Sequence, residues 1–219
     1  MQAIFQDIIA GDLDGVRRRV AVDPGSVALV ATDDVVQHSG HSTLMAALIA
    51  GQFAIADFLL DHGADTGYID EPNRETYARP VLHDAITAAV FRTLPAPAIA
   101  AAPSDGASES FAFLVRLLEA GADVNVPDSQ GNSSLFRAAS DTWAVLQCAG
   151  LERQIDPALR ADLLRIFTAL VSHGGDPRRP EPHHGISVAD IYRDHAIGRL
   201  LKHAVQASPM DHQAPALKM

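Results

Sequence analysis

Histidine, cysteine and aspartate are the residue types in this chain that could carry acid–base, nucleophilic or metal chemistry. The sequence holds 10 His but one Cys, Cys148. Nucleophilic catalysis needs a Ser or Cys beside a positioned base, and the sequence has no G-x-S-x-G, G-x-G-x-x-G, H-E-x-x-H or P-loop motif. Cys148 stands among Leu146, Gln147 and Ala149 and is expected to be a small buried side chain. We therefore predict no catalytic residue, no metal ligand and no cofactor, and expect that the chain is not an enzyme.

Two histidines have a structural explanation that needs no chemistry, and two others form a weak metal motif. His62 and His173 each stand directly before a Gly at the end of an apolar segment. A cation at this position is stabilised by the dipole of a helix C-terminus. His183 and His184 follow Pro182 in a linker, and two adjacent His on a loop are a weak metal motif.

Composition and charge narrow the classes of partner. The 219 residues are 47% hydrophobic, and 17 Lys and Arg stand against 27 Asp and Glu, for a formal charge of −10. This composition predicts a globular protein, and its negative charge argues against nucleic acid or an anionic membrane as partner. A protein with a basic surface fits better. The single Cys, and a segment Met1–Ala10 without a basic start or a continuous apolar run, predict a cytoplasmic protein.

The elements that position these residues recur along the chain. Three apolar segments end alike, at 60–65, 118–125 and 171–176, each with Gly followed by Ala or Gly and then Asp. Ala-rich segments with Leu at a fixed place precede them, at 42–47, 80–85 and 133–139. A Ser before an apolar run caps a helix, and a Gly after a helix supplies positive φ. Each unit is therefore expected to be a pair of antiparallel helices that must stack on neighbouring pairs to bury its apolar faces.

These segments resemble the ankyrin repeat, whose unit has a T-P-L-H-x-A opening and a period of about 33 residues. The segment 40–65 follows the family pattern through Gly40, Ser42, Leu44, Gly51 and Gly63. The Pro of the opening is replaced by Thr43, Val81 and Ser134. The resemblance implies an all-α ankyrin-repeat solenoid of about five stacked helical hairpins with finger loops. It also implies that His83, at the His of the opening, bonds backbone groups of the adjacent finger.

The resemblance divides the chain into one domain, 1–207, and a disordered tail, 208–219. The units are expected at about 2–38, 39–76, 77–129, 130–183 and 184–207, of which the first and last are caps.

Two units are longer than the family pattern. Gly131 and Gly174 are 43 residues apart where Gly40 and Gly63 are 23 apart, so this unit carries an insertion of 20 residues, and the unit before it has another of the same length. The insertion at about 92–110 has Pro, Gly and Ser and is expected to be a flexible loop. The insertion at about 141–160 is expected to extend the first helix and to start a further turn at Asp156. Both should emerge at the edge opposite the fingers.

The family geometry places candidate binding residues on the finger loops and on the inner positions of the first helices. The finger at 65–77 is about five residues longer than the pattern and holds two of the three Tyr; Tyr and Arg are enriched at interface hot spots. The alternative is that its Tyr rings cover the base of their own loop. Acidic residues on the fingers either form a solvated face or face a partner. The protein-binding candidates are His41, Tyr68, Asp70, Glu71, Arg74, Tyr77, Asp84, Asp128, Gln130, Asn132 and Arg137.

The resemblance implies protein binding as the activity, through the concave face and the long finger. The acidic charge suggests an inhibitor or immunity protein that blocks a basic toxin or enzyme, and we expect it to be monomeric. One alternative is an effector directed at host proteins. Another is an enzyme whose site lies in the insertions, with Asp141, Cys148 or Asp156 beside a His.

Overall fold

The computed structural model describes residues 2–32, 40–70, 78–94, 106–150 and 155–208. Within these ranges the chain forms ten α-helices and one short 3₁₀ helix, and the only extended pairing is in isolated β-bridges. The all-α prediction is confirmed at this level. The helices are α1 Ala3–Ala10, α2 Leu13–Val22, η1 Pro24–Ala28, α3 Thr43–Ile49, α4 Phe53–Asp61, α5 Val81–Phe91, α6 Gly106–Glu119, α7 Ser134–Cys148, α8 Pro157–Ser172, α9 Val188–Ile191 and α10 Ala196–Ala207.

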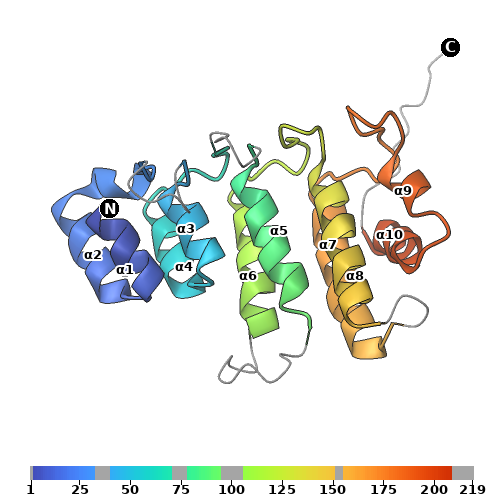
Figure 1. The fold of residues 1–219 in the computed structure, drawn as a ribbon, viewed down its shortest axis with the longest axis horizontal. Coiled ribbons are helices and arrows are strands. Elements are labelled where there is room, and N and C mark those ends of the chain that lie inside the picture. The colour runs from blue at the N-terminus through green and yellow to red at the C-terminus, as the bar shows by residue number, and fades with distance from the viewer. Residues whose placement is uncertain (1, 33–39, 71–77, 95–105, 151–154, 209–219) are drawn as a thin grey trace, which may run out of the picture.

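The helices lie in two layers (Figure 1). Consecutive helices pack as pairs, α1 with α2 and so on to α9 with α10, and the pairs lie in a row. The odd-numbered helices contact one another along one layer, and the even-numbered helices contact one another along the other. We call the helices of one layer, α1, α3, α5, α7 and α9, the inner helices, and those of the other, α2, α4, α6, α8 and α10, the outer helices. The loops that precede α3, α5 and α7 lie along one edge of the row (Figure 1).

Side chains of Ser begin three of the inner helices. The hydroxyls of Ser42, Ser133 and Ser187 each accept a hydrogen bond from the backbone N–H three residues on, at 3.2 Å. This satisfies one of the donors that a helix start leaves unpaired. The N-cap of α5 is Pro80, whose side chain makes no such bond. The expected Ser caps are therefore confirmed where Ser is present.

The outer helices end as the sequence predicts. Gly63, Gly121 and Gly174 have φ of 87°, 99° and 99°, a region that glycine adopts without strain. His62 and His173 donate from Nδ1 to carbonyls four residues earlier, at 2.7 and 2.8 Å. The same two carbonyls also accept from the backbone N–H of His62 and His173, at 3.2 Å each, so each imidazole adds a second bond at the last turn of its helix.

The insertions lengthen the middle pairs. α3 and α4 have 7 and 9 residues, whereas α7 and α8 have 15 and 16. The second insertion extends the first helix as predicted, since α7 continues to Cys148. Asp156 caps α8 by accepting from the N–H groups of Ala158 and Leu159. The C-terminal ends of α5 and α7 lie at the edge opposite the loops (Figure 1), as expected for both insertions.

Two expectations about the insertions are wrong. Residues 106–110, predicted as loop, form the first turn of α6, and Ser110 is fully buried. The guanidinium of Arg165 covers the ring of Phe111 at 4.5 Å, and this contact with α8 holds the early turns of α6 in place. Cys148 is exposed rather than buried, because it is the last residue of α7, beyond the part that neighbouring helices cover.

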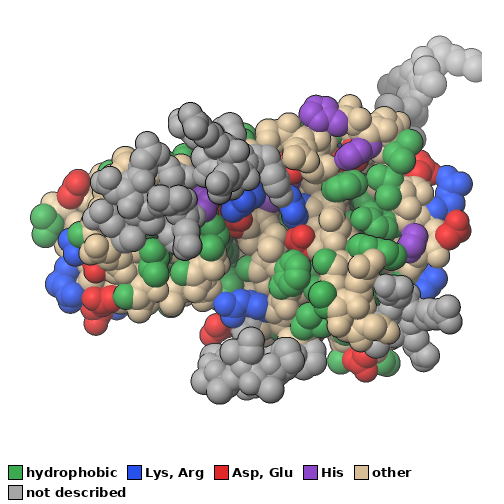
Figure 2. Space-filling model, viewed as in Figure 1, with side chains coloured by type: hydrophobic (Ala, Val, Ile, Leu, Met, Phe, Trp, Pro, Cys, Tyr) green, Lys and Arg blue, Asp and Glu red, His purple; other side chains and the backbone are tan. Residues whose placement is uncertain are grey.

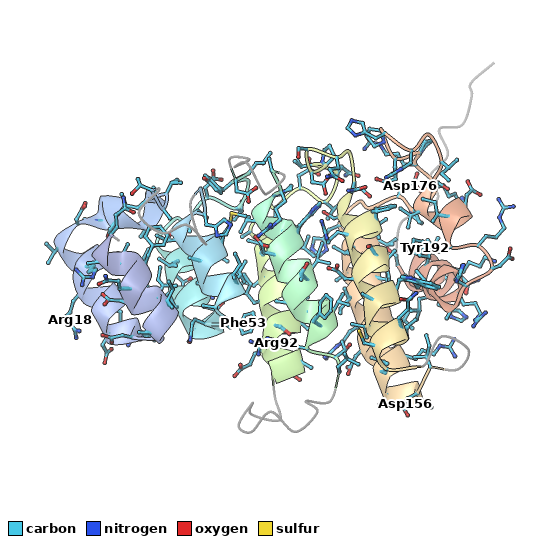
Figure 3. All side chains as sticks on the ribbon, viewed as in Figure 1. Arg18, Phe53, Arg92, Asp156, Asp176 and Tyr192 are labelled. Carbon is cyan, nitrogen blue, oxygen red and sulfur yellow. The ribbon has the colours of Figure 1, made fainter. Side chains whose placement is uncertain are left out.

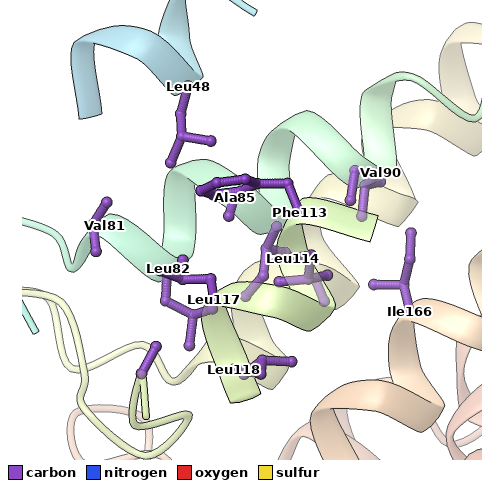
Figure 4. Close-up of a cluster of buried hydrophobic side chains, with 14 of the residues drawn as sticks. Leu48, Val81, Leu82, Ala85, Val90, Phe113, Leu114, Leu117, Leu118 and Ile166 are labelled. Carbon is purple, nitrogen blue, oxygen red and sulfur yellow. The ribbon is translucent and has the colours of Figure 1, made fainter. Parts of the chain in front are cut away.

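The core runs between the layers along the whole row. A single cluster of buried apolar side chains extends from Ile4 in α1 to Ala204 in α10. Figure 4 shows its middle, where Phe113 and Leu114 of α6 pack against α5 between Leu48 of α3 and Ile166 of α8. The buried side chains of α3 and α5 include four small Ala residues, Ala46, Ala47, Ala85 and Ala89, which let neighbouring helices approach closely.

Some predictions concern residues outside the described ranges. They are the finger segment 71–77, the loop part 95–105 of the first insertion, the segment 151–154 of the second, and the tail from residue 209. Within the ranges that are described, no helix is long and apolar enough to cross a membrane.

Candidate binding groove on the inner helices

A groove opens on the inner helices between α3, α5 and α7. Its volume is about 440 Å³. Figure 2 shows basic and acidic side chains gathered over the upper part of α5 and α7, with hydrophobic side chains below them. The lining residues are Leu48, Ile49, Arg79, Asp84, Thr87, Ala88, Phe91, Arg92 and Arg137.

The order of residues along α5 divides the groove into a polar end and an apolar end. Asp84 and Thr87 lie one turn apart near the start of α5, and Ala88 and Phe91 follow on the same face. At 1.5 Å per residue, the seven residues from Asp84 to Phe91 span about 10 Å. The groove therefore offers charged and apolar contacts about two helical turns apart.

Two large side chains form the apolar end. Ile49, at the end of α3, and Phe91, at the end of α5, are each 43% exposed although both line the groove. Beside them the guanidinium of Arg92 lies over the ring of Phe53, 4.8 Å from its centroid (Figure 3). This contact holds the Arg92 stem against the groove. Exposed apolar side chains within a concave surface are typical of binding sites.

Asp84 dominates the polar end. Its Oδ1 accepts a hydrogen bond from Nε of Arg79 at 2.8 Å, and its Oδ2 is buried without a partner. Burial raises the pKa of Asp84 to about 6, although the positive charge of Arg79 acts to lower it. Asp84 is thus a carboxylate that burial makes costly to ionise and that still has one acceptor atom to offer.

A second polar contact joins α5 to α7. The hydroxyl of Thr87 donates to Oδ2 of Asp141 at 2.7 Å. Burial raises the pKa of Asp141, an effect reduced by this bond and by Arg137. Arg137 reaches two carboxylates, with Nη1 3.7 Å from Asp141 and Nη2 3.6 Å from Asp128. The polar end is therefore continuous with a cluster on α7 and the loop before it.

Asp128 and Asp70 occupy buried positions in their loops. Asp128 accepts from the N–H groups of Gln130 and Asn132 at 2.9 and 3.0 Å and from the Asn132 side chain at 3.0 Å. Asp70 accepts from the N–H of Arg79. Both are less than 5% exposed, which corrects the expectation that they present charge to a partner. Each carboxylate instead accepts backbone hydrogen bonds that stabilise the conformation of its loop.

The other candidates on these loops divide between buried and exposed. His41 is buried, with Nε2 3.8 Å from Asp70. Tyr68 is half-buried and donates to the carbonyl of Gly40 at 2.6 Å. Its hydroxyl therefore bonds the preceding loop, before α3, and not the base of its own finger. Gln130 is exposed.

Asn132 lies at the end of the polar cluster. It is half-buried, and its Oδ1 lies 3.0 Å from Nε2 of His184. The His184 ring stacks on Phe136 at 5.1 Å.

No group of three or more His, Cys, Asp or Glu within the described ranges is placed to hold a metal ion. Glu71, Arg74 and Tyr77 lie outside those ranges.

His83 differs from the expectation. It is fully buried, but neither Nδ1 nor Nε2 has a hydrogen-bond partner, so the bond to an adjacent finger is absent. Burial lowers the pKa of His83 to about 4, and nearby Arg137 acts in the same direction. The imidazole is therefore neutral at pH 7 and adds no positive charge to the cluster.

Sequence reasoning missed several groove residues. Among them are Ile49, Arg79, Thr87, Phe91 and Arg92. The spacing of Asp84, Thr87 and Phe91, at i, i+3 and i+7, could have placed the three on one helix face. Arg79 stands just before the start of α5 and joins the groove through its bond to Asp84, five residues along the chain.

The residues suggested for an enzyme site serve separate purposes. Asp141 bonds Thr87, Asp156 caps α8, and Cys148 is exposed at the end of α7. No family model matches the chain, and no curated protein matches it. The function must therefore be inferred from the groove and the fold.

Proposed function

We propose that the chain is an ankyrin-repeat domain that binds a segment of another protein in the groove on its inner helices. Three features support the repeat assignment. They are the pattern from Gly40 to Asp65, the helix pairs in two layers, and the isolated β-bridges that close the loops before α3, α5 and α9. Such a row needs neighbouring pairs to bury its apolar faces, and the core runs through all of it.

The observation that carries the binding proposal is the exposure of Ile49 and Phe91 inside the groove. Leaving two large apolar side chains in water costs free energy that a partner recovers on binding. Interfaces commonly combine an apolar centre with a polar rim, and Asp84, Arg79 and Arg137 supply such a rim.

Binding is proposed rather than catalysis because of the groups that line the groove. The hydroxyl in the lining is that of Thr87, which already donates to Asp141. The charge of −10 further favours a partner with a basic surface, because opposite charges speed association. An inhibitor or immunity protein acting on a basic toxin or enzyme would have this property.

The test is selection of a phage-displayed random peptide library on the wild-type domain. Peptides enriched on the wild type should bind Ile49→Ala/Phe91→Ala at least about tenfold more weakly, because two buried apolar contacts are lost. The matched control is Val22→Ala/Ile186→Ala, which removes exposed apolar side chains outside the groove and should leave binding unchanged. Absence of enrichment, or equal binding to both variants, would remove the proposal.

A further inference from the structure

The polar end of the groove has an unused hydrogen-bond acceptor. The Asp84 side chain is 10% exposed and lines the groove, and its Oδ2 has no partner while Oδ1 bonds Arg79. A buried carboxylate oxygen without a partner is costly, and a donor that reaches it recovers that cost. The fold therefore leaves a specific place for a hydrogen-bond donor.

The surrounding charges favour a donor that is also a cation. Among the described residues the cluster holds the carboxylates of Asp70, Asp84, Asp128 and Asp141 against the guanidinium groups of Arg79 and Arg137. His83 is neutral at pH 7 because burial lowers its pKa to about 4. When the four carboxylates are ionised they outnumber the two guanidinium groups. The cluster therefore keeps a net negative charge whether His41, beside Asp70, is neutral or protonated.

An anionic ligand fits less well. Arg79 already bonds Asp84, and both ends of the Arg137 guanidinium face carboxylates. Arg92 lies over Phe53 at the apolar end. An acidic group would have to displace these contacts and enter a region with excess carboxylates, so its binding would be opposed.

We propose that the polar end of the groove binds a Lys or Arg side chain of the partner segment, held by Asp84, while an apolar side chain about 10 Å away packs on Ile49 and Phe91. This deepens the binding function proposed above and rests on it. In an extended peptide that spacing corresponds to about three residues. Because Oδ2 is covered in the free protein, a side-chain rotation in the groove accompanies entry of the cation.

Binding of a cation here depends on pH in a definite direction. Burial holds the pKa of Asp84 at about 6, with Arg79 and Arg137 opposing the rise and Asp70 adding to it. Asp141 and Thr87 face the same region from α7 and α5. The cation prefers the ionised carboxylate, so affinity rises as pH increases from 5 to 7.5.

The experiment uses peptides from the library selection that depend on Ile49 and Phe91. A basic residue should recur in them, and its replacement by citrulline for Arg or norleucine for Lys should weaken binding about tenfold, measured by fluorescence anisotropy. Asp84→Asn should weaken the basic peptide by a similar factor and the neutral peptide much less, so the two changes are not additive. Asp65→Asn, at an exposed loop position, is the control and should have no effect.

The outcomes separate the two proposals. If the peptides depend on Ile49 and Phe91 but hold no basic residue, or bind Asp84→Asn unchanged, the cation site is overturned and the groove stands. If no peptide depends on Ile49 and Phe91, both fall. Asp84→Asn preserves shape and is checked by thermal unfolding. Should it fail to fold, the neutral peptide and the pH profile of the wild type decide, because a flat profile between pH 5 and 7.5 contradicts the site.

Discussion

Charged side chains join neighbouring helix pairs on both layers of this molecule, but in different surroundings. On the inner helices and the loop before α7, the carboxylates of Asp84, Asp141 and Asp128 are at most 10% exposed. On the outer helices Arg116 of α6 bridges Asp57 and Asp61 of α4, and these side chains are 38%, 44% and 61% exposed. The same residue types thus meet in a buried cluster on one layer and in water on the other.

The difference shows that forming an ion pair does not by itself determine how much a charged side chain contributes to stability. In water an ion pair gains little, because solvent screens it and two long side chains lose freedom. In a buried cluster each charge has lost its hydration, so a group that loses its partner is left with a large cost. The inner cluster should therefore respond strongly to single substitutions and to pH, and the outer pairs weakly.

The largest effect is expected for Asp128→Ala. It removes the acceptor for the N–H groups of Gln130 and Asn132 and a carboxylate facing Arg137. We expect a loss of about 3 kcal/mol in the free energy of unfolding, measured with urea. Asp128→Asn keeps an acceptor oxygen and should cost about half as much. A loss below about 1 kcal/mol would show that burial of this cluster does not amplify its contacts.

The adjacent residues His83 and Asp84 should give opposite pH dependences. The folded pKa of His83 is about 4, below its ordinary 6.5, so the unfolded chain takes up protons first and stability falls by about 3 kcal/mol from pH 7 to pH 4. The folded pKa of Asp84 is about 6, above its ordinary 3.8, so the folded chain takes up protons first and stability rises by about 2 kcal/mol over the same range.

Two variants separate these contributions in urea unfolding at pH 7 and pH 4. His83→Gln should lose less stability on acidification than the wild type, and Asp84→Asn should lose more. Parallel changes in all three proteins would mean that neither group is held away from its ordinary pKa.

The smallest effect is expected for Arg116→Ala. It removes the pairs with Asp57 and Asp61, and we expect a cost below about 1 kcal/mol that shrinks further in 0.5 M salt. Urea unfolding at low and high salt measures both. If this variant cost as much as Asp128→Ala, the contrast between the two layers would be lost.

Much of the fold could be predicted from short segments. Ser42 and Ser133 cap helices three residues from their partners, and His62 and His173 bond carbonyls four residues earlier. These contacts form within one turn, so residue type and spacing suffice. The site was predicted less well. Asp84 and Arg137 do line the groove, but Asp70 and Asp128 are buried, and the apolar end was missed.

The amino-acid sequence by itself determined where several of the described helices begin or end, because caps and glycine stops act over a few residues, although it did not give the start of α6. The tertiary structure alone decided which polar groups are buried away from solvent. Thr87 meets Asp141 from 54 residues away, Arg116 meets Asp57 from 59, and Asp84 keeps an unpaired oxygen. Burial depends on every element packed around a group, and no local pattern records it. For this reason the polar and apolar ends of the groove depend on how the helix pairs pack side by side.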